Sequence, residues 1–300
     1  MRVSVIVTAR DEEPAILEAT LAGLHATTRH LDTEVIVIDD GSRVPVGCGA
    51  WPVRLLRNPV AAGCCASRAM GARAATGEVL VWLDAHMSFG ENWLEQMLVW
   101  AGTGALLCSP FWSYDLTDCM CWGADFTWRG QRDYAAQIYP GFGVAHRVSA
   151  PAELAAETPM AIGACYMMQR DSYRSIGGFC PHFRVWGADE QDISARAWMA
   201  GLGVRCVSLA RVGHLTRVQF PYPVRFEHLE FNQLVMLRSL FEPETVRRLE
   251  RYFHPLAGEV EAWLADTDLS GWRRTVQSAR KLSDQDFFAR FAPDLLACTR

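Results

Sequence analysis

The chain of 300 residues lacks the features that mark membrane proteins and nucleic-acid-binding proteins. No apolar run reaches the roughly 18 residues that a membrane span needs. The net charge is −5, so there is no basic excess with which to hold nucleic acid or an anionic membrane. The opening stretch, MRVSVIVTARDEE, passes quickly into charge, whereas a secretory signal has a longer apolar region. We therefore expect a soluble, cytoplasmic protein with no nucleic-acid partner and no membrane span.

Two further absences narrow the possible functions. The chain has ten cysteines, but without a secretory signal we expect them to be reduced. Cys119 and Cys121 form an isolated Cys-x-Cys pair, whereas zinc sites usually have two paired clusters, so we expect no structural zinc there. A Gly- and Lys-rich phosphate loop is missing after the first apolar run, which argues against a nucleotidyltransferase.

The first hundred residues alternate short β-branched runs with helical patterns. The expected strands are 3–8, 34–38, 53–56 and 79–83, and the expected helices are 14–26 and 61–75. Continuous apolar strands separated by helices indicate an α/β fold whose sheet is covered by helices on both faces. Ligands bind such sheets at the carboxyl ends of the strands, where Thr8, Asp39, Asp40 and Asp84 lie.

The remaining two thirds of the chain have a less regular pattern. Residues 109–158 are rich in Trp, Tyr, Gly and Asp, so we expect loops and short strands there. Strand-like runs return at 161–169 and 204–209, with a helical pattern at 189–200 between them. Helical patterns continue from about residue 227 to the end of the chain.

Two residues at the end of an apolar strand supply ligands that divalent metal ions take. Asp84 and His86 close the 79–83 run, and residues two apart in a strand point to the same side. A carboxylate and an imidazole suit Mn²⁺ or a similar first-row ion. Downstream, His214 could complete the ligand set and Arg217 could pair with a phosphate. A capping aspartate with surface or structural histidines is the alternative.

An acidic helix start supplies a second group of candidates. Asp189, Glu190 and Asp192 follow Trp186 and Gly187 at the expected start of the 189–200 helix. A carboxylate there could be a general base that deprotonates an acceptor hydroxyl, or it could orient sugar hydroxyls. The alternative is an acidic first turn with a capping aspartate, an interpretation that we favour for Asp192.

Polar residues near the first strand ends are candidates for nucleotide binding. Thr8 and Glu12 follow the first strand, and Asp40 belongs to the turn after the second. A carboxylate in this turn could accept the imide N–H of uracil, although Asp-Asp-Gly turns are common. Arg68, on the alanine-rich helix, could reach a phosphate, and an ordinary surface arginine is equally consistent with its position.

Taken together, the motifs resemble a known family. The segments are, in order, VSVIVTARDEE, EVIVIDDGS, GARAATGEVLVWLDAH, ETPMAIGACYMMQRDSY, IGGF, VWGADEQDISARAW and RVGHLTR. They resemble GT-A-fold glycosyltransferases, both the large family with an N-terminal DDGS motif and the polypeptide N-acetylgalactosaminyltransferases. The resemblance covers residues 1–217 and implies a Rossmann-like mixed sheet with helices on both faces. It also implies a UDP-sugar donor and a Mn²⁺, Mg²⁺ or other divalent cofactor.

The resemblance carries roles over to individual residues of this chain. The matched positions are the metal ligands Asp84, His86 and His214; the phosphate-contacting Arg217; the nucleotide contacts Thr8 and Asp40; Met160, Ala161 and Gly163 near the donor sugar; and Trp186 and Asp189 of a Trp-Gly-Gly-Glu-like motif.

Four positions depart from the family pattern. Arg10 replaces a histidine after the first strand, Ala188 replaces a glycine, and Asp189 is one methylene shorter than the usual glutamate. Glu190 stands where the retaining enzymes have asparagine. Inverting relatives carry a carboxylate base at this position, which favours inversion with Glu190 as the base. The metal motifs, however, are closer to those of the retaining enzymes.

The resemblance therefore predicts a metal-dependent glycosyltransferase that moves a hexose or N-acetylhexosamine from UDP to a hydroxyl of an unidentified acceptor. A retaining enzyme without a base, and a non-catalytic UDP-sugar-binding protein, are the alternatives. We expect a catalytic domain at 1–217, with a nucleotide-binding half (1–108) and an acceptor and sugar half (109–217). Residues 218–300 should form a lid and a helical C-terminal segment packed on the core.

Overall fold

The computed structural model describes residues 1–127, 131–132, 138–139, 143–162, 164–217, 219–250, 253 and 258–293. Its first part contains each strand and helix expected there. The elements are β1 (Val3–Ala9), α1 (Pro14–Thr28), β2 (Thr33–Asp39), β3 (Val53–Arg57), α2 (Cys64–Ala74) and β4 (Val79–Asp84). The start of α1 follows from Pro14, whose fixed backbone angle suits the first helical position.

Short strands dominate the middle of the chain, as its irregular composition predicts. They are β5 (Met87–Phe89), β6 (Leu106–Cys108), β7 (Phe111–Ser113), β8 (Cys119–Cys121), β9 (Ala124–Thr127), β10 (Gln131–Arg132), β11 (Ile138–Tyr139), β12 (Gly143–His146) and β13 (Ala155–Glu157). The helix α3 (Trp93–Leu98) and a 3₁₀ turn (Ala101–Thr103) lie among them.

The last part of the chain returns to longer elements. They are β14 (Cys165–Gln169), α4 (Arg170–Ser175), α5 (Asp189–Met199), β15 (Val204–Val207), β16 (Val212–His214), α6 (Phe226–Leu240), α7 (Pro243–Glu250), α8 (Gly258–Ala265), α9 (Ser270–Ala279) and α10 (Asp284–Phe291). The strand expected at 161–169 begins only at Cys165, after Ala164 has adopted a left-handed backbone (φ 99°).

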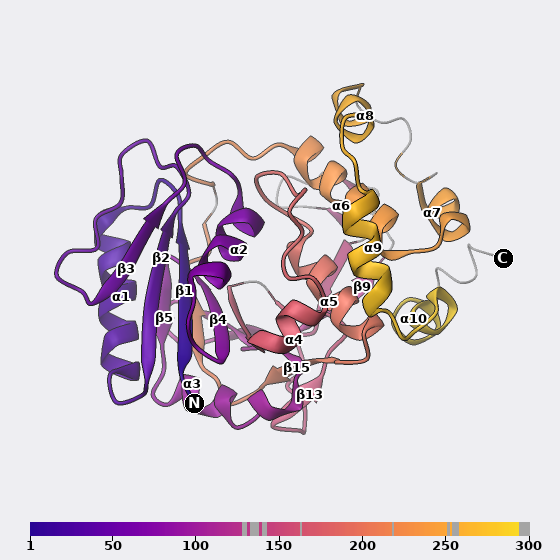
Figure 1. Cartoon of the computed structure of the whole chain (residues 1–300). Coiled ribbons are helices and arrows are strands. Elements are labelled where there is room, and N and C mark those ends of the chain that lie inside the picture. Colours follow the sequence, from indigo (N-terminus) through magenta and orange to yellow (C-terminus); the bar gives the residue numbers. More distant parts are fainter. Residues whose placement is uncertain are drawn as a thin grey trace.

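The main sheet is mixed, with the order β13-β15-β6-β14-β4-β1-β2-β3. Strands β1 to β4 pair in parallel, whereas β14 runs antiparallel between β4 and β6. Side chains alternate between the two faces of each strand, so Ile6 packs on the α2 side and Val5 and Val7 on the α1 side. Figure 1 shows α1 and α2 on opposite faces of this sheet. The predicted fold, a mixed sheet with helices on both faces, is confirmed.

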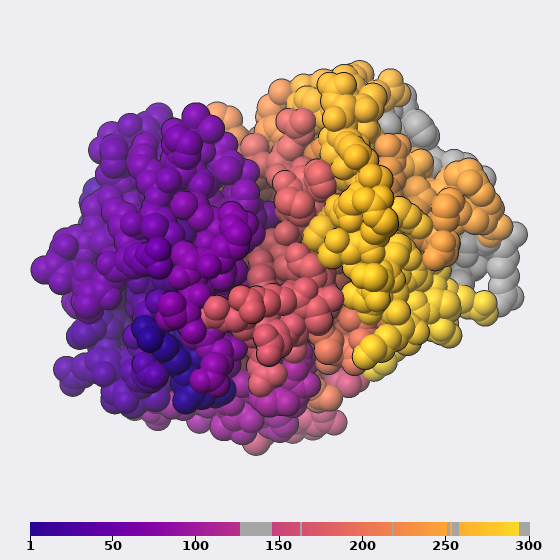
Figure 2. Space-filling model, viewed as in Figure 1, coloured from indigo at the N-terminus to yellow at the C-terminus, as the bar shows by residue number. Residues whose placement is uncertain are grey.

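The C-terminal helices form the second half of the molecule. Figure 1 places α6 to α10 beyond α4 and α5, away from β1 to β3, and Figure 2 shows the α4–α5 region between the two halves. Phe231, Leu234 and Phe287 belong to the same buried cluster as Ile6 and Trp82. The predicted helical C-terminal extension is therefore present and shares the core. Within the described residues, no helix combines the length and apolar character that a membrane crossing requires.

Asp192 has a different role from the cap expected for it. The left-handed Ala188 (φ 66°) is the N-cap of α5, and it makes no side-chain cap. Asp192 instead accepts hydrogen bonds from Nε and Nη2 of Arg196 at 3.0 and 2.6 Å, and both side chains are only 2% exposed. The capping interpretation was wrong because an arginine one turn later offers a charged partner in the core.

We expect Asp192→Ala to lower the free energy of unfolding by about 3–5 kcal/mol, because it leaves a buried arginine without its countercharge. Urea denaturation of the variant would measure the loss. Glu244→Ala is the matched control, since Glu244 pairs with Arg248 at the same spacing on the surface. Equal stability of the two variants would contradict the assignment.

Candidate active site

Three metal-ligand side chains meet where β4 and β16 end. Asp84 is the last residue of β4, and His86 lies in the bend before β5 rather than in the strand itself. Antiparallel pairing of β5 with β16 sets His214 opposite Met87. The Leu215 amide donates to the His86 carbonyl at 3.0 Å. This pairing brings the residues together, so the strand alternation assumed from the sequence was the wrong reason.

The geometry of this group suits a single ion. The ligand atoms of Asp84, His86 and His214 all lie within 4.8 Å of one another, and Nε2 of His214 is 3.4 Å from Oδ2 of Asp84. Burial alone would raise the pKa of Asp84, but hydrogen bonding to His214 and the positive charge of Arg68 hold it well below its usual range. One carboxylate and two imidazoles are a donor set for a first-row divalent cation.

Glu12 lies behind the group, where it pairs with His86 and Arg217. A 2.9 Å hydrogen bond joins its Oε2 to Nδ1 of His86, and Oε1 is ion-paired with Nη2 of Arg217. Its side chain is only 3% exposed. Burial would raise the pKa of Glu12, but the bonds from His86 and Arg217 lower it. This bond orients the His86 ring and leaves its Nε2 available to a metal ion, while the nucleotide contact predicted for Glu12 stays a prediction.

Arg68 joins the group to the start of α5. Its Nη2 is 3.1 Å from Oδ1 of Asp84, and its Nη1 is ion-paired with Asp189. The residue is only 4% exposed. Both Nη groups already bond to carboxylates inside the protein, so the phosphate contact predicted for Arg68 has no support in this structure.

The loop before α5 has an unusual backbone. Val185 (φ 43°), Gly187 (φ 97°) and Ala188 (φ 66°) all have left-handed angles. Asn232 of α6 holds the loop: its amide donates to the carbonyls of Arg184, Trp186 and Gly187, and its oxygen accepts from the Arg184 amide at 2.7 Å. Strained backbone held by its surroundings is common at functional sites. No motif in the sequence pointed to Asn232.

Glu190 faces the sheet from the first turn of α5. The hydroxyl of Tyr166, on β14, donates to its Oε1 at 2.8 Å. Burial, followed by the negative charge of Asp189, raises the pKa of Glu190 to about 8. A carboxyl with a pKa of about 8 can exchange its proton near neutral pH, whereas the Asp189 carboxylate is ion-paired with Arg68. The contact of Glu190 with Tyr166 could not be predicted from the sequence.

The nucleotide-side candidates differ in their surroundings. Thr8 is paired with Asp84 in the parallel register of β1 and β4, so it lies at the carboxyl edge of the sheet. Asp40 is buried and accepts hydrogen bonds from Asn58 and from the amides of Ala62 and Gly63, at 2.8–3.0 Å. It therefore shapes the loop before α2, and the structure gives no support to its predicted uracil contact.

Arg10 and Trp186 lie under the segment that follows Arg217. The Arg10 guanidinium is 4.4 Å from the centre of the Tyr222 ring, and its buried Nη1 has no hydrogen-bond partner among the described residues. The Trp186 ring lies 5.1 Å from that of Phe220. Phe220 and Tyr222 thus contact two of the candidate residues, and the role of their segment as a lid stays a prediction. Gly163 lies outside the described residues.

Comparisons with known proteins relate this chain to glycosyltransferases. A family model described as "Glycosyl transferase family 2" matches residues 4–177. A second, described as "N-terminal domain of galactosyltransferase", matches residues 145–220.

The curated relatives are larger proteins. Polypeptide N-acetylgalactosaminyltransferase 10 of Rattus norvegicus is 28% identical over 270 residues, covering 83% of this chain and 44% of the relative. Polypeptide N-acetylgalactosaminyltransferase 14 of Homo sapiens is 29% identical over 238 residues, covering 73% and 41%. The chain thus spans about two fifths of the length of these relatives.

Two solved structures share the fold. One is GalNAc-T7 crystallised with UDP, GalNAc and Mn²⁺, with a TM-score of 0.73 and 18% identity over 98% of this chain and 57% of that one. The other is S. aureus TarS 1–349 in complex with UDP-GlcNAc, with a TM-score of 0.56 and 13% identity over 99% and 84%.

Proposed function

The chain belongs to glycosyl transferase family 2, and from this membership we propose that it transfers a sugar from a UDP-sugar to an acceptor hydroxyl with the help of a divalent metal ion. The observation that carries the proposal is the convergence of Asp84, His86 and His214 at the carboxyl edge of the sheet. Ligands of open α/β sheets bind at this edge. We assign the reaction to residues 1–217, and the lid and helical segment to 218–300.

The residues fit the metal that the family resemblance implies. Asp84, His86 and His214 would hold Mn²⁺ or a similar ion, since carboxylate and imidazole are suitable ligands for it. The bound ion would supply positive charge against the negative charge that grows on a departing diphosphate. Arg217, whose side chain is 21% exposed, has N–H groups beyond the one paired with Glu12 and can add a hydrogen bond to phosphate.

The donor that the comparisons favour is a UDP-N-acetylhexosamine. The curated relatives are named N-acetylgalactosaminyltransferases, and the two structural neighbours hold UDP with GalNAc or UDP-GlcNAc. Release of UDP from UDP-GalNAc and UDP-GlcNAc, with Mn²⁺ and then with a chelator, tests the proposal. Metal-dependent release supports it, and metal-independent release contradicts the role of Asp84, His86 and His214.

We propose that Glu190 accepts the proton of the acceptor hydroxyl. Its raised pKa suits a group that takes up a proton near neutral pH, and the Tyr166 hydroxyl fixes one of its oxygens. Asp189 is less suited because Arg68 neutralises it in the interior. Proton removal by a carboxylate implies inversion at the anomeric carbon. In the alternative, a retaining transfer, Glu190 would only position groups.

Glu12→Gln is expected to weaken Mn²⁺ binding in the presence of UDP by about 10–100-fold, the usual cost of losing the partner that orients a histidine ligand. The amide keeps the shape of the side chain but loses the charge that pairs with Arg217 and His86. A Mn²⁺ titration, followed by the electron paramagnetic resonance signal of the free ion, measures the change in affinity. Glu18→Gln, on the exposed side of α1, is the control. Unchanged affinity in Glu12→Gln would remove Glu12 from this role.

A further inference from the structure

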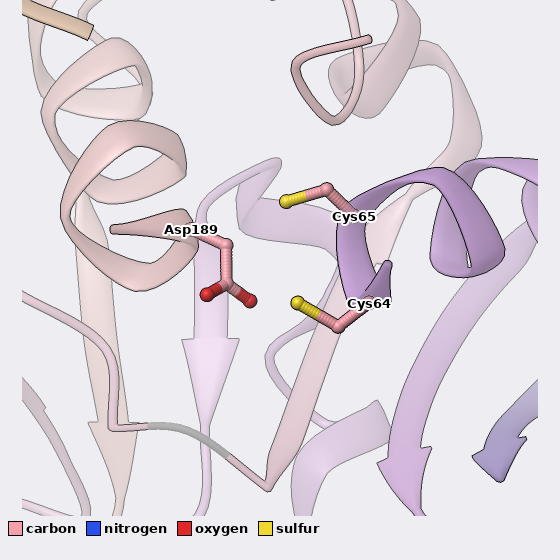
Figure 3. A group of neighbouring side chains, drawn as sticks. All are labelled: Cys64, Cys65 and Asp189. Atoms are coloured by element: carbon pink, nitrogen blue, oxygen red, sulfur yellow. The ribbon is translucent and has the colours of Figure 1, made fainter. Parts of the chain in front are cut away.

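Two adjacent cysteines point at the same buried carboxylate. Cys64 and Cys65 form the first turn of α2, and Asp189 begins α5. The two sulfur atoms and a carboxylate oxygen all lie within 4.8 Å of one another. Figure 3 shows both thiols directed towards the Asp189 carboxylate, across the space between the two helices. Neither cysteine has a part in the transfer proposed above.

One carboxylate oxygen in this group has no hydrogen-bond partner within the part of the chain that the structure describes, which makes it a candidate ligand atom. Asp189 is 2% exposed, and one of its oxygens, Oδ1, has no hydrogen-bond partner among the described residues. Burying a carboxylate oxygen that accepts no hydrogen bond costs free energy. A cation that binds this oxygen would offset that cost. Cys65 is buried as well, whereas Cys64 is half-buried and leaves a route from solvent.

We propose that Cys64, Cys65 and Asp189 form a second metal site, which takes a thiophilic divalent cation such as Zn²⁺ or Cd²⁺. Thiolates select such ions, whereas Mn²⁺ prefers oxygen and imidazole ligands, so the two sites of the chain differ in the ions they hold. Zinc–sulfur bonds of about 2.3 Å place two sulfur ligands roughly 3.8 Å apart, so shifts of about 1 Å would close the group on an ion.

The charges of the filled site balance within the interior. As the cation enters, each thiol releases its proton to solvent and becomes a thiolate. Two thiolates and the Asp189 carboxylate carry three negative charges, which the divalent cation and the buried Arg68 guanidinium neutralise. The positive end of α2 also lies at these cysteines and favours thiolates there.

Filling the site would act on the proposed active site through Arg68. This residue is ion-paired with Asp189 and also bonds to Asp84, one of the proposed Mn²⁺ ligands. A cation at the thiols binds the same Asp189 carboxylate and weakens its ion pair with Arg68. Arg68 then holds Asp84 less firmly in place. We therefore expect Zn²⁺ or Cd²⁺ to inhibit transfer by way of the cysteines. This consequence rests on the proposed function, whereas the binding itself does not.

Cadmium binding to the full chain tests the site without any assay of transfer. Cd²⁺ is titrated alone into the reduced protein, and binding is followed by the ultraviolet charge-transfer band of cadmium thiolates. We expect one equivalent to bind, with the affinity lowered roughly 100-fold or more in Cys64→Ala and in Cys65→Ala, because each removes a direct ligand. The half-buried Cys64 makes its variant the safer of the two for folding, and thermal melting checks both.

Two controls separate this site from other cation sites. Cys119→Ala removes a cysteine from the Cys-x-Cys pair of β8, and His86→Ala removes a proposed Mn²⁺ ligand that takes no part in the ion pairs of Arg68; both should keep the band and the affinity. A band that persists in the Cys64 and Cys65 variants, or that disappears with Cys119, would overturn the proposal. Cadmium that binds at the thiols without inhibiting transfer would uphold the site and contradict only the coupling through Arg68.

Discussion

Asp84→Asn is expected to lower the rate of sugar transfer by about a thousandfold, because a bound divalent ion stabilises the charge of the transition state by several kcal/mol. Asparagine keeps the shape of the side chain but removes the charge that the ion and Arg68 both contact. The measurement is UDP release under saturating donor and Mn²⁺. The fold should persist, since Asp84 lies at the carboxyl edge of the sheet rather than in its core.

Asp171→Asn, on the exposed side of α4, is the matched control and should keep the full rate. If Asp84→Asn transferred sugar as fast as this control, the metal would bind elsewhere, or the reaction would not need it. Higher Mn²⁺ concentrations should restore part of the rate of Asp84→Asn, because His86 and His214 remain.

Glu190→Gln is expected to lower the rate by roughly 10²–10⁴-fold, the usual contribution of a positioned general base. Glutamine can still accept the hydrogen bond from Tyr166, so binding of UDP and Mn²⁺ should change little. Rates and binding are measured separately on the same variant. Tyr166→Phe is the companion variant: it removes only the hydroxyl that holds Glu190, and its loss should be smaller.

The anomeric configuration of the product tests the same assignment independently. NMR of the transferred sugar should show inversion if Glu190 takes the acceptor proton. Retention of configuration, or a near-normal rate in Glu190→Gln, would exclude Glu190 as the base and favour the retaining alternative. Loss of UDP binding in Glu190→Gln would instead mean that this carboxylate shapes the donor pocket.

The sequence predicted the fold well because its signals were local. Each signal lies within one short continuous segment, as in the apolar runs of β1, β2 and β4 and the helical spacing of α1. The structure contains all of these elements. The three candidate metal ligands were recognisable as residue types. The family resemblance grouped them as one ligand set, but the local pattern could not show how they meet, because that depends on the pairing of β5 with β16, strands more than 120 residues apart in the sequence.

The supporting contacts could not be predicted from local pattern. Glu12 lies 74 residues from His86, and Arg68 lies 121 residues from Asp189. Sequence reasoning therefore assigned Glu12 and Arg68 to ligand binding and could not foresee their ion pairs inside the protein. Asn232 lies outside every motif, and Tyr166 lies within one but had no role assigned, since an amide on a helix and a phenol in a strand are ordinary core residues until the loop or carboxylate they hold is known.

The most direct test of the account is the thermal stability of the chain with UDP, in the presence and absence of Mn²⁺. A ligand that binds only the folded protein raises the melting temperature by mass action. We predict that UDP stabilises the protein when Mn²⁺ is present, that UDP-N-acetylhexosamines do so as well, and that Asp84→Asn abolishes the dependence on metal. A UDP-induced shift of equal size with and without Mn²⁺, or no shift with any nucleotide sugar, would contradict a metal-bound UDP-sugar at Asp84, His86 and His214.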